Sequence, residues 1–221
     1  MIKAVIFDLD GVLVHTDRFH FMAWKRLADE LNIPFDEVFN QRLRGLSRMD
    51  SLDEILKISN KLYSVTEKNL LAERKNSTYK SLIANMTPSD VTQEVLNTLE
   101  VLRQRRLYLA VGSSSKNAYF ILEKTGLYPC FDAVADGTMI AHAKPDPEVF
   151  LKAAGLLGVA PGEAVVVEDA RAGIMAAKTG GFMAIAVGEA RSCKLADAAL
   201  DRFLDLPELL TCFKHFKIKK T

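Results

Sequence analysis

The sequence predicts an α/β protein: a doubly wound parallel sheet, Rossmann-like, with an inserted helical cap domain. Two observations predict the core. Short apolar runs alternate with helix-like segments through the second half of the chain, and one more apolar run opens it. Alternation of this kind favours right-handed βαβ units and a parallel sheet. A third observation predicts the cap, because a long span with helix-like patterns and no strand-like run separates the first strand from the others.

The first strand is predicted at residues 4–7, where an uninterrupted apolar run is typical of a strand buried on both faces. Further apolar runs predict strands at 107–111, 133–135, 164–167 and 183–187. The segments between them predict helices at 117–125, 147–157 and 170–179. Each of these helices is followed by a glycine, which commonly ends a helix.

We assign residues 1–14 and 91–221 to the catalytic core and residues 15–90 to the cap. Within the cap, helix-like patterns lie at 19–31, 36–41, 51–60 and 67–83. A connection this long is not expected to be a simple loop. Both of its ends are predicted to start near the strand ends of the core, which suits a lid.

The composition is that of an ordinary globular protein, with 49% hydrophobic and 26% charged residues and a net charge of +1. This balance gives no electrostatic reason to expect nucleic acid or a membrane surface as a partner. The first apolar run is too short for a signal-peptide core, and no stretch approaches the roughly 20 apolar residues of a membrane span. The three cysteines lack metal-ligand spacing, which predicts reduced thiols. We therefore expect a cytoplasmic, monomeric protein.

Acidic pairs follow two of the predicted strands. Asp8 comes directly after the first strand, and Asp10 lies two residues further on, on the same side of an extended chain. Glu168 and Asp169 follow the strand at 164–167. Ligands of open α/β sheets bind at the carboxyl ends of the strands, so these acids are expected to meet there. A capping role for one aspartate of each pair is the alternative interpretation.

Two further segments are expected at the same edge. The second strand runs into Gly112-Ser113-Ser114-Ser115-Lys116-Asn117, whose hydroxyls and amides precede a helix start, an arrangement that favours anion binding. A helix-capping serine explains only one of these hydroxyls. Lys144 lies in a loop with Pro145 and Pro147. A lone lysine is more often a surface residue, so Lys144 indicates a site only in combination with the acids and hydroxyls at the other strand ends.

Four carboxylates in one crevice need compensation. Mg²⁺ with oxygen ligands supplies two positive charges, Lys144 supplies one, and protonation of one acid removes the remaining charge. Such a site suits phosphoryl transfer, in which Asp8 attacks phosphorus, Asp10 moves a proton, and Lys144 and Ser113 hold the phosphoryl oxygens. The predicted metal ligands are Asp8, Asp10, Glu168 and Asp169.

The order Asp8-Leu9-Asp10-Gly11-Val12, Ser113, Lys144-Pro145, Glu168-Asp169 resembles the four motifs of the haloacid-dehalogenase-like phosphotransferases. In that family, a small helical insertion after the first motif selects the substrate. The cap segments and the stretch after the second strand are similar to the beta-phosphoglucomutase group of the family. This similarity implies a set of substrate-binding residues: Thr16, His20, Trp24, Arg44, Gly45, Leu46, Arg48, Ser51, Lys75, Ser115, Lys116 and Asn117.

Several of these residues have a plainer interpretation. Trp24 lies four residues after His20 on one helix face and would also suit the cap core. Ser47 and Asp50 form a capping-box pattern that does not require the neighbouring Arg48. Arg48 suits a second phosphate instead, as does Arg44. Lys75 would ordinarily lie on a solvated helix face.

The resemblance implies that beta-D-glucose 1-phosphate and D-glucose 6-phosphate interconvert through the 1,6-bisphosphate and a phosphorylated Asp8. It also implies that Arg48 holds the non-reacting phosphate and that His20 and Lys75 help to position the acid/base. Two departures from the group's pattern are His15, where an acid is usual, and Arg44, where a lysine is usual. A sugar-phosphate phosphatase and a catalytically silent phosphosugar-binding regulator are the alternatives.

Overall fold

The computed structural model describes residues 1–43, 46–59 and 61–213. The chain forms two compact units. The α/β unit contains Met1–His15 and the described residues from Thr87 onward, and the helical unit is Thr16–Met86. The insertion was predicted at 15–90, so in the structure it begins one residue later and ends four residues earlier. Arg44 and Gly45, which were predicted to bind substrate, lie outside the described residues.

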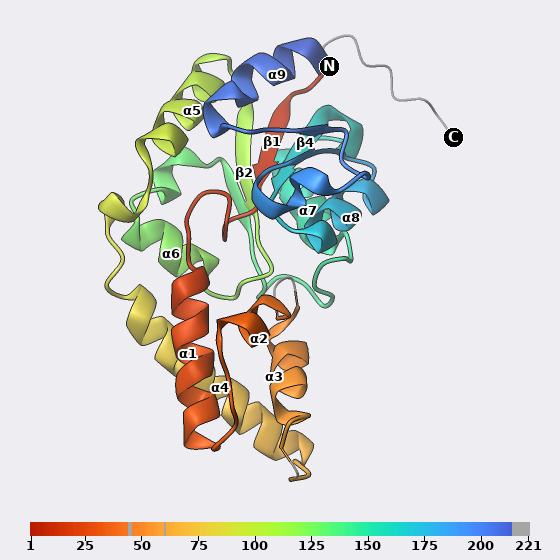
Figure 1. The fold of residues 1–221 in the computed structure, drawn as a ribbon. Coiled ribbons are helices and arrows are strands. Elements are labelled where there is room, and N and C mark those ends of the chain that lie inside the picture. Colours follow the sequence, from red (N-terminus) through yellow and green to blue (C-terminus); the bar gives the residue numbers. More distant parts are fainter. Residues whose placement is uncertain (44–45, 60, 214–221) are drawn as a thin grey trace. The chain divides into compact units, whose positions relative to one another are not determined.

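The α/β unit contains a parallel sheet with the strand order β3-β2-β1-β4-β5-β6. Its central strands β2, β1 and β4 are labelled in Figure 1. The strands are β1 Ala4–Phe7, β2 Tyr108–Gly112, β3 Ala133–Ala135, β4 Ala164–Glu168, β5 Met183–Ala186 and β6 Ala198–Ala199. From β1 the sheet grows in one direction through β2 and β3 and in the other through β4, β5 and β6. The switch between β1 and β4 is where doubly wound folds bind ligands, and the predicted fold class is confirmed.

Helices cover both faces of this sheet. On one face, Ile6 and Val166 pack with Phe150 and Ile174 in a single buried core. On the other, Phe7 contacts Phe203, with ring centroids 5.9 Å apart. The opposite directions of Ile6 and Phe7 follow from the two-residue repeat of a strand. The helices of this unit are α5 Gln93–Gln104, α6 Ala118–Lys124, α7 Glu148–Leu157, α8 Arg171–Thr179 and α9 Leu206–Cys212.

Short 3₁₀ turns complete the connections of the α/β unit. They lie at Pro88–Asp90, Tyr128–Cys130, Pro161–Glu163, Gly188–Ser192 and Phe203–Asp205. The glycine stop predicted after α7 is confirmed, because Gly158 has a φ of 68°, in the left-handed region that favours glycine. The strands and helices that were predicted for this unit agree with the structure to within one residue at either end.

The helical unit contains α1 Asp17–Glu30, α2 Glu37–Gln41, α3 Arg48–Leu56 and α4 Val65–Ile83. Its core includes Trp24, Leu52 and Ile55. Helix α3 begins earlier than the predicted residue 51 because Ser47 caps it, with the Ser47 Oγ accepting a hydrogen bond from the Asp50 N–H at 3.2 Å. The structure thus has a helix at each of the four places in the insertion where the sequence predicts one.

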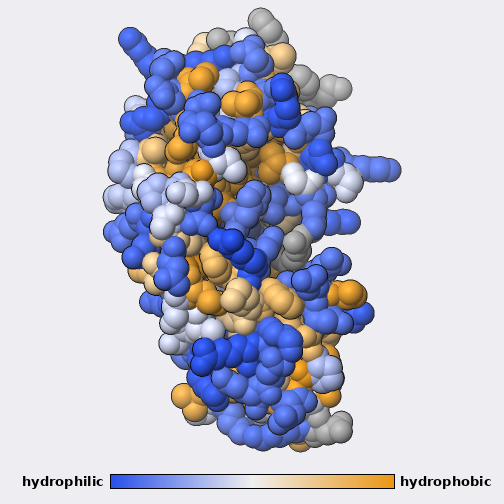
Figure 2. Space-filling view, turned by 60° about the vertical axis from the view of Figure 1, so that its left-hand side comes forward, coloured by the Kyte–Doolittle hydropathy of each residue, from blue (hydrophilic) through white to orange (hydrophobic). Residues whose placement is uncertain are grey.

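The molecular face shown in Figure 2 carries mostly hydrophilic side chains, with smaller apolar areas among them. Exposed apolar side chains of the helical unit include Leu62 and Val65. Scattered apolar residues of this kind are normal for a folded protein surface. None of the described helices combines the length and the apolar character that a membrane span requires.

Candidate active site

The register of the central strands brings three strand ends level. Phe7 of β1 is paired with Val111 of β2 and with Val167 of β4. The next residue along β1 is Asp8, whose N–H donates to the Val167 carbonyl at 3.0 Å. Glu168 is the corresponding next residue of β4. The sheet itself therefore places Asp8 and Glu168 side by side at the edge where ligands are expected.

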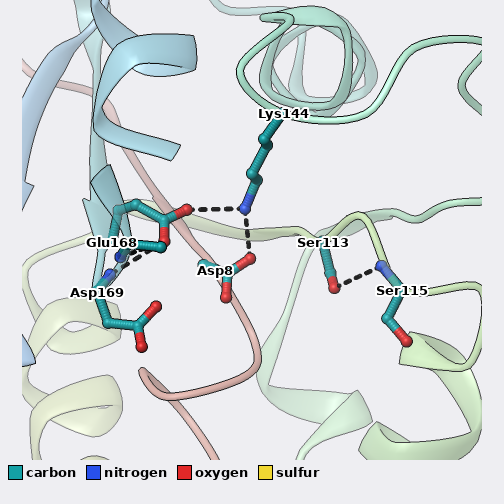
Figure 3. A network of polar contacts seen from close by, with 7 residues as sticks. Asp8, Ser113, Ser115, Lys144, Glu168 and Asp169 are labelled. Atoms are coloured by element: carbon teal, nitrogen blue, oxygen red, sulfur yellow. Dashed lines mark hydrogen bonds and ion pairs between the residues drawn. The ribbon is translucent and has the colours of Figure 1, made fainter. Parts of the chain in front are cut away.

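Lys144 lies between these two acids (Figure 3). Its Nζ donates to Asp8 Oδ1 and, at 2.8 Å, to Glu168 Oε2. The Lys144 side chain is only 9% exposed, and its Nζ lies 4.5 Å from the centre of the Phe150 ring. Lys144 is thus a buried partner of the acidic pair rather than a surface lysine.

Asp8, Glu168 and Asp169 each offer a carboxylate oxygen, and these oxygens all lie within 4.8 Å of one another. Glu168 Oε1 also accepts hydrogen bonds from the N–H groups of Asp169 and Ala170, at 3.0 and 2.9 Å. Ala170 is the N-cap of α8, without a side-chain cap bond, so Asp169 does not cap this helix. Among the described residues, the grouped carboxylates do not include Asp10.

Two glycines leave the space that these carboxylates occupy. A Cβ added to Gly11 would lie 2.0 Å from Asp169 Oδ2, and a Cβ added to Gly173 would lie 1.8 Å from Glu168 Oε2. Gly11 also has a φ of 85°, which allows its N–H to donate to the Val14 carbonyl in the turn after β1. Three grouped carboxylate oxygens in such a cradle are a donor set that fits a hard divalent cation.

The electrostatics of the site also indicate excess negative charge. Burial raises the pKa of Asp8 to about 7; Lys144 opposes this shift, and Glu168 and Asp10 add to it. Burial likewise raises the pKa of Asp169 to about 9, with further contributions from the charges of Asp8 and Glu168. Burial alone would lower the pKa of Lys144, but Asp8 and Glu168 outweigh it and raise that pKa. One ammonium does not compensate these acids.

The loop after β2 supplies the neighbouring hydroxyls and amides. Ser113 is 1% exposed, and its Oγ accepts a hydrogen bond from the Ser115 N–H at 3.1 Å (Figure 3). The Ser115 Oγ accepts in turn from the Asn117 N–H at 3.2 Å. Asn117 is buried at the N-cap of α6, whereas Lys116 is exposed. Of the predicted residues in this loop, Ser113 and Asn117 are therefore fixed inside the protein.

In the helical unit, a second lysine is buried. Lys75 is 3% exposed, and its Nζ lies 2.9 Å from His20 Nδ1. The Nζ also lies 4.6 Å from the ring centre of Trp24 and 4.8 Å from that of Tyr79. Lys75 therefore does not lie on a solvated helix face, where such a lysine would ordinarily be found. Tyr79 was missed in the sequence, although it lies four residues after Lys75 on the same helix face.

The pKa values of Arg48 and His20 are both lowered. Burial, followed by the charges of Lys75 and Arg48, lowers the pKa of His20 well below its usual value. Burial also lowers the pKa of Arg48, although Glu73, 3.8 Å away, opposes this shift. These groups form a basic region in which the imidazole stays neutral near pH 7.

The remaining predicted residues of the helical unit differ in exposure. Thr16 is fully buried, and its carbonyl accepts from the His20 N–H at 3.1 Å. Ser51 is buried in α3, and Trp24 is 3% exposed within the core of the unit. Leu46 is 43% exposed. Trp24 therefore belongs to the core of the unit and also contacts Lys75.

The sequence profile of the haloacid dehalogenase-like hydrolases matches residues 2–181. The chain is 41% identical over 206 residues to a beta-phosphoglucomutase of Bacillus subtilis, covering 92% of this chain and 91% of that protein. It is 31% identical over 185 residues to a phosphorylated carbohydrates phosphatase of Thermotoga maritima, covering 81% and 82%.

Among solved structures, the chain resembles a beta-phosphoglucomutase from Clostridium difficile, with a TM-score of 0.89 and 38% identity over 97% of this chain and 98% of that one. The resemblance that the motifs indicated is confirmed, because sequence and structure point to the same proteins. The chain belongs to the haloacid dehalogenase-like hydrolase family.

Proposed function

We propose that this protein is an Mg²⁺-dependent beta-phosphoglucomutase that interconverts beta-D-glucose 1-phosphate and D-glucose 6-phosphate through a phosphorylated Asp8 and glucose 1,6-bisphosphate. One observation supports the chemistry: Asp8 lies at a strand end within a group of three acids, and the ammonium of Lys144 binds it directly. The 41% identity to the Bacillus subtilis enzyme supports the choice of substrate.

In the first step, an oxygen of Asp8 attacks the phosphorus of the bisphosphate. The bond from this oxygen to phosphorus forms as the bond from phosphorus to the sugar oxygen breaks. The ammonium of Lys144, which contacts Asp8 Oδ1, holds the carboxylate in place and stabilises charge on the phosphoryl oxygens. Ser113, at the end of the neighbouring strand, is proposed to donate to the same oxygens.

Asp10 is the proposed proton carrier. It protonates the sugar oxygen that leaves, and in the return transfer it takes the proton of the attacking sugar hydroxyl. Asp10 was also predicted to be a metal ligand. Its carboxylate is not part of the described oxygen group, which favours the proton role over ligation through that carboxylate.

Asp8, Glu168 and Asp169 would hold the metal ion. Mg²⁺ bound there would supply positive charge to the transferring phosphoryl group. The residues fit such an ion because their oxygens are grouped, the glycine cradle keeps space beside them, and Lys144 leaves negative charge uncompensated.

In the helical unit, we propose that Arg48 binds the phosphate that does not react, as a charge-assisted donor. His20 and Lys75 are proposed to decide which acceptor reaches the phosphorylated Asp8. The second candidate function, a sugar-phosphate phosphatase, has support from the Thermotoga maritima relative and would use the same Asp8 with water as acceptor. A catalytically silent regulator has no such support, because the chain retains the acids and the lysine of all four family motifs.

The deciding experiment supplies beta-D-glucose 1-phosphate with Mg²⁺, with and without glucose 1,6-bisphosphate, and measures glucose 6-phosphate and inorganic phosphate together. A mutase forms many molecules of glucose 6-phosphate for each phosphate released. A ratio below one would replace the mutase by the phosphatase. A His20→Ala variant should form less glucose 6-phosphate and release a larger share of phosphate than the parent protein.

A further inference from the structure

Two packed helices of the helical unit each present a pair of residues four apart. Helix α1 presents His20 and Trp24, and helix α4 presents Lys75 and Tyr79. Residues at this spacing lie on one helix face. The rings of His20 and Tyr79 face each other, with centroids 4.2 Å apart and planes 35° apart. We call these four residues the tetrad.

The centre of the tetrad is the Lys75 ammonium. It is nearly enclosed, and a buried lysine ordinarily tends to lose its proton. Here, however, Nζ lies 4.6 Å from the Trp24 ring centre and 4.8 Å from the Tyr79 ring centre. Aromatic faces within about 6 Å stabilise a cation electrostatically, more strongly where water is excluded. The two rings therefore favour the charged form of Lys75.

A charged Lys75 determines where His20 carries its proton. An ammonium has three donor hydrogens and no acceptor. Because Nζ and His20 Nδ1 are 2.9 Å apart, Nδ1 has to accept, and the ring hydrogen has to lie on Nε2. A second proton on the imidazole would place two cations side by side. Among the described residues, Arg48 of α3, which is paired with Glu73, also acts on the ring and disfavours the imidazolium.

We propose that Trp24 and Tyr79 form an aromatic cage that keeps Lys75 charged, and that the charged Lys75 holds His20 as the neutral tautomer protonated at Nε2. Trp24 and Tyr79 are then positioning residues that act through Lys75 and His20. This proposal rests on the proposed function in one respect only. If His20 acts on the acceptor as proposed above, it does so as a hydrogen-bond donor through Nε2.

The direct test is ¹⁵N NMR of the imidazole nitrogens in protein labelled at histidine. The chain has four histidines, and the signals that a His20→Gln variant lacks belong to His20. We expect a protonated Nε2 and an unprotonated Nδ1, unchanged between pH 5.5 and 8.5. A proton on Nδ1, or an ordinary imidazolium titration in that range, would overturn the proposal without any variant.

Matched variants test the cage. Tyr79→Phe and Trp24→Phe keep an aromatic face, whereas Tyr79→Leu and Trp24→Leu remove it and keep apolar bulk. The Phe variants should retain the signature of His20, and the Leu variants should lose it, as should Lys75→Met. Retention of the signature in both Leu variants, with folding verified by circular dichroism, would mean that the rings only fill space.

Kinetics separate this inference from the proposed function. The Tyr79→Leu variant should lose roughly 2- to 30-fold in kcat for isomerisation. Phosphorylation of Asp8 by acetyl phosphate should stay unchanged, and Tyr79→Phe should restore kcat. If the parent protein never forms a phosphorylated Asp8, the proposed function fails, while the NMR result still decides the cage. Equal losses in Tyr79→Phe and Tyr79→Leu would count against the cage.

Discussion

The two units each bury a lysine, and they surround it in opposite ways. In the α/β unit, Lys144 contacts the carboxylates of Asp8 and Glu168. In the helical unit, the contacts of Lys75 include an imidazole nitrogen of His20 and the faces of two aromatic rings. Both lysines are almost enclosed, but Lys144 contacts two carboxylates, whereas the described contacts of Lys75 include two aromatic rings.

This difference assigns different work to the two lysines. Lys144 is bound to the proposed nucleophile itself, so its charge acts on the reacting atoms. The described contacts of Lys75 instead control a neighbouring imidazole, so its charge acts on the geometry and protonation of another residue. A buried lysine is thus not one kind of site, and the atoms around Nζ indicate which kind it is.

The largest effect is expected from a change at Asp8, the carboxylate that Lys144 binds. Asp8→Asn should abolish turnover and the phosphorylated enzyme, because an amide cannot attack phosphorus as an anion. The measurement is ³²P incorporation into denatured protein together with isomerase activity. Asp201→Asn, at a surface ion pair of the same unit, is the control and should keep both. Labelling that persists in Asp8→Asn would place the nucleophile elsewhere.

The two lysines can be compared directly as methionine variants. Lys144→Met should lose Asp8 phosphorylation by acetyl phosphate as well as isomerisation. It should also lower the free energy of unfolding by about 3–5 kcal/mol, since it leaves buried acids without their partner. Lys75→Met should lose only isomerisation, by about 10- to 150-fold. The exposed residues Lys152 and Lys80 provide the control substitutions. Equal losses of Asp8 phosphorylation in both variants would mean that the two lysines have the same role.

A further variant sharpens the role of the helical unit. Arg48→Ala should weaken the productive complex with glucose 1,6-bisphosphate by about 10- to 150-fold, through loss of a charge-assisted contact. Acetyl phosphate has no second phosphate, so its reaction with Asp8 should hardly change. Arg26→Ala, on the exposed side of α1, is the control. Equal losses on both substrates would make Arg48 a structural residue.

The smallest expected effect concerns the acids around Lys144. Their pKa values of about 7 and 9 lie above the ordinary 3.8, so without metal the folded protein binds more protons than the unfolded chain in that interval. The free energy of unfolding should therefore fall as pH rises from about 4 to 9. A fixed Mg²⁺ concentration, 100 times the Kd at pH 8.5, should raise Tm by roughly 5–10 °C at pH 8.5 and by less at pH 5.5, because protons on these acids compete with the ion.

Differential scanning fluorimetry measures this shift, with NaCl at equal ionic strength as the control. Asp169→Asn removes one of the two raised acids and should reduce the pH dependence of the Mg²⁺ effect. An identical gain in Tm at both pH values would show that these carboxylates do not couple to the ion.

The sequence predicted best where chemistry and local pattern coincide. Asp8 and Glu168 were assigned to one site because parallel strands align their carboxyl ends, and Lys144 was added because the acids need a compensating charge. Among the described α-helices and strands, α5, α9 and β6 were not predicted. Helix α5 has apolar residues at Val95, Leu99 and Leu102, a helical spacing that could have revealed it. Strand β6 has two alanines, too few for any pattern.

The two residue pairs of the tetrad could be predicted from the sequence, but their contact could not. The spacing of His20 and Trp24 was visible in the sequence, and that of Lys75 and Tyr79 was equally available. What the sequence does not contain is the packing of α1 against α4, which turns two helix faces into one enclosed cluster. Burial of Lys75 is a property of that tertiary contact and has no local signal.

The aligned register of β1 and β4 has a consequence for how the gene can vary. Phe7 opposes Val167, and the side chains of a strand alternate between its two sides. Deleting one codon inside Ala164–Glu168 would turn every later side chain of that strand to the other side, away from Lys144. The turn at Pro161–Glu163, outside the ladder, can change length while the register holds. Natural length variation among relatives should therefore be absent from the strand and concentrated in the turns that flank it.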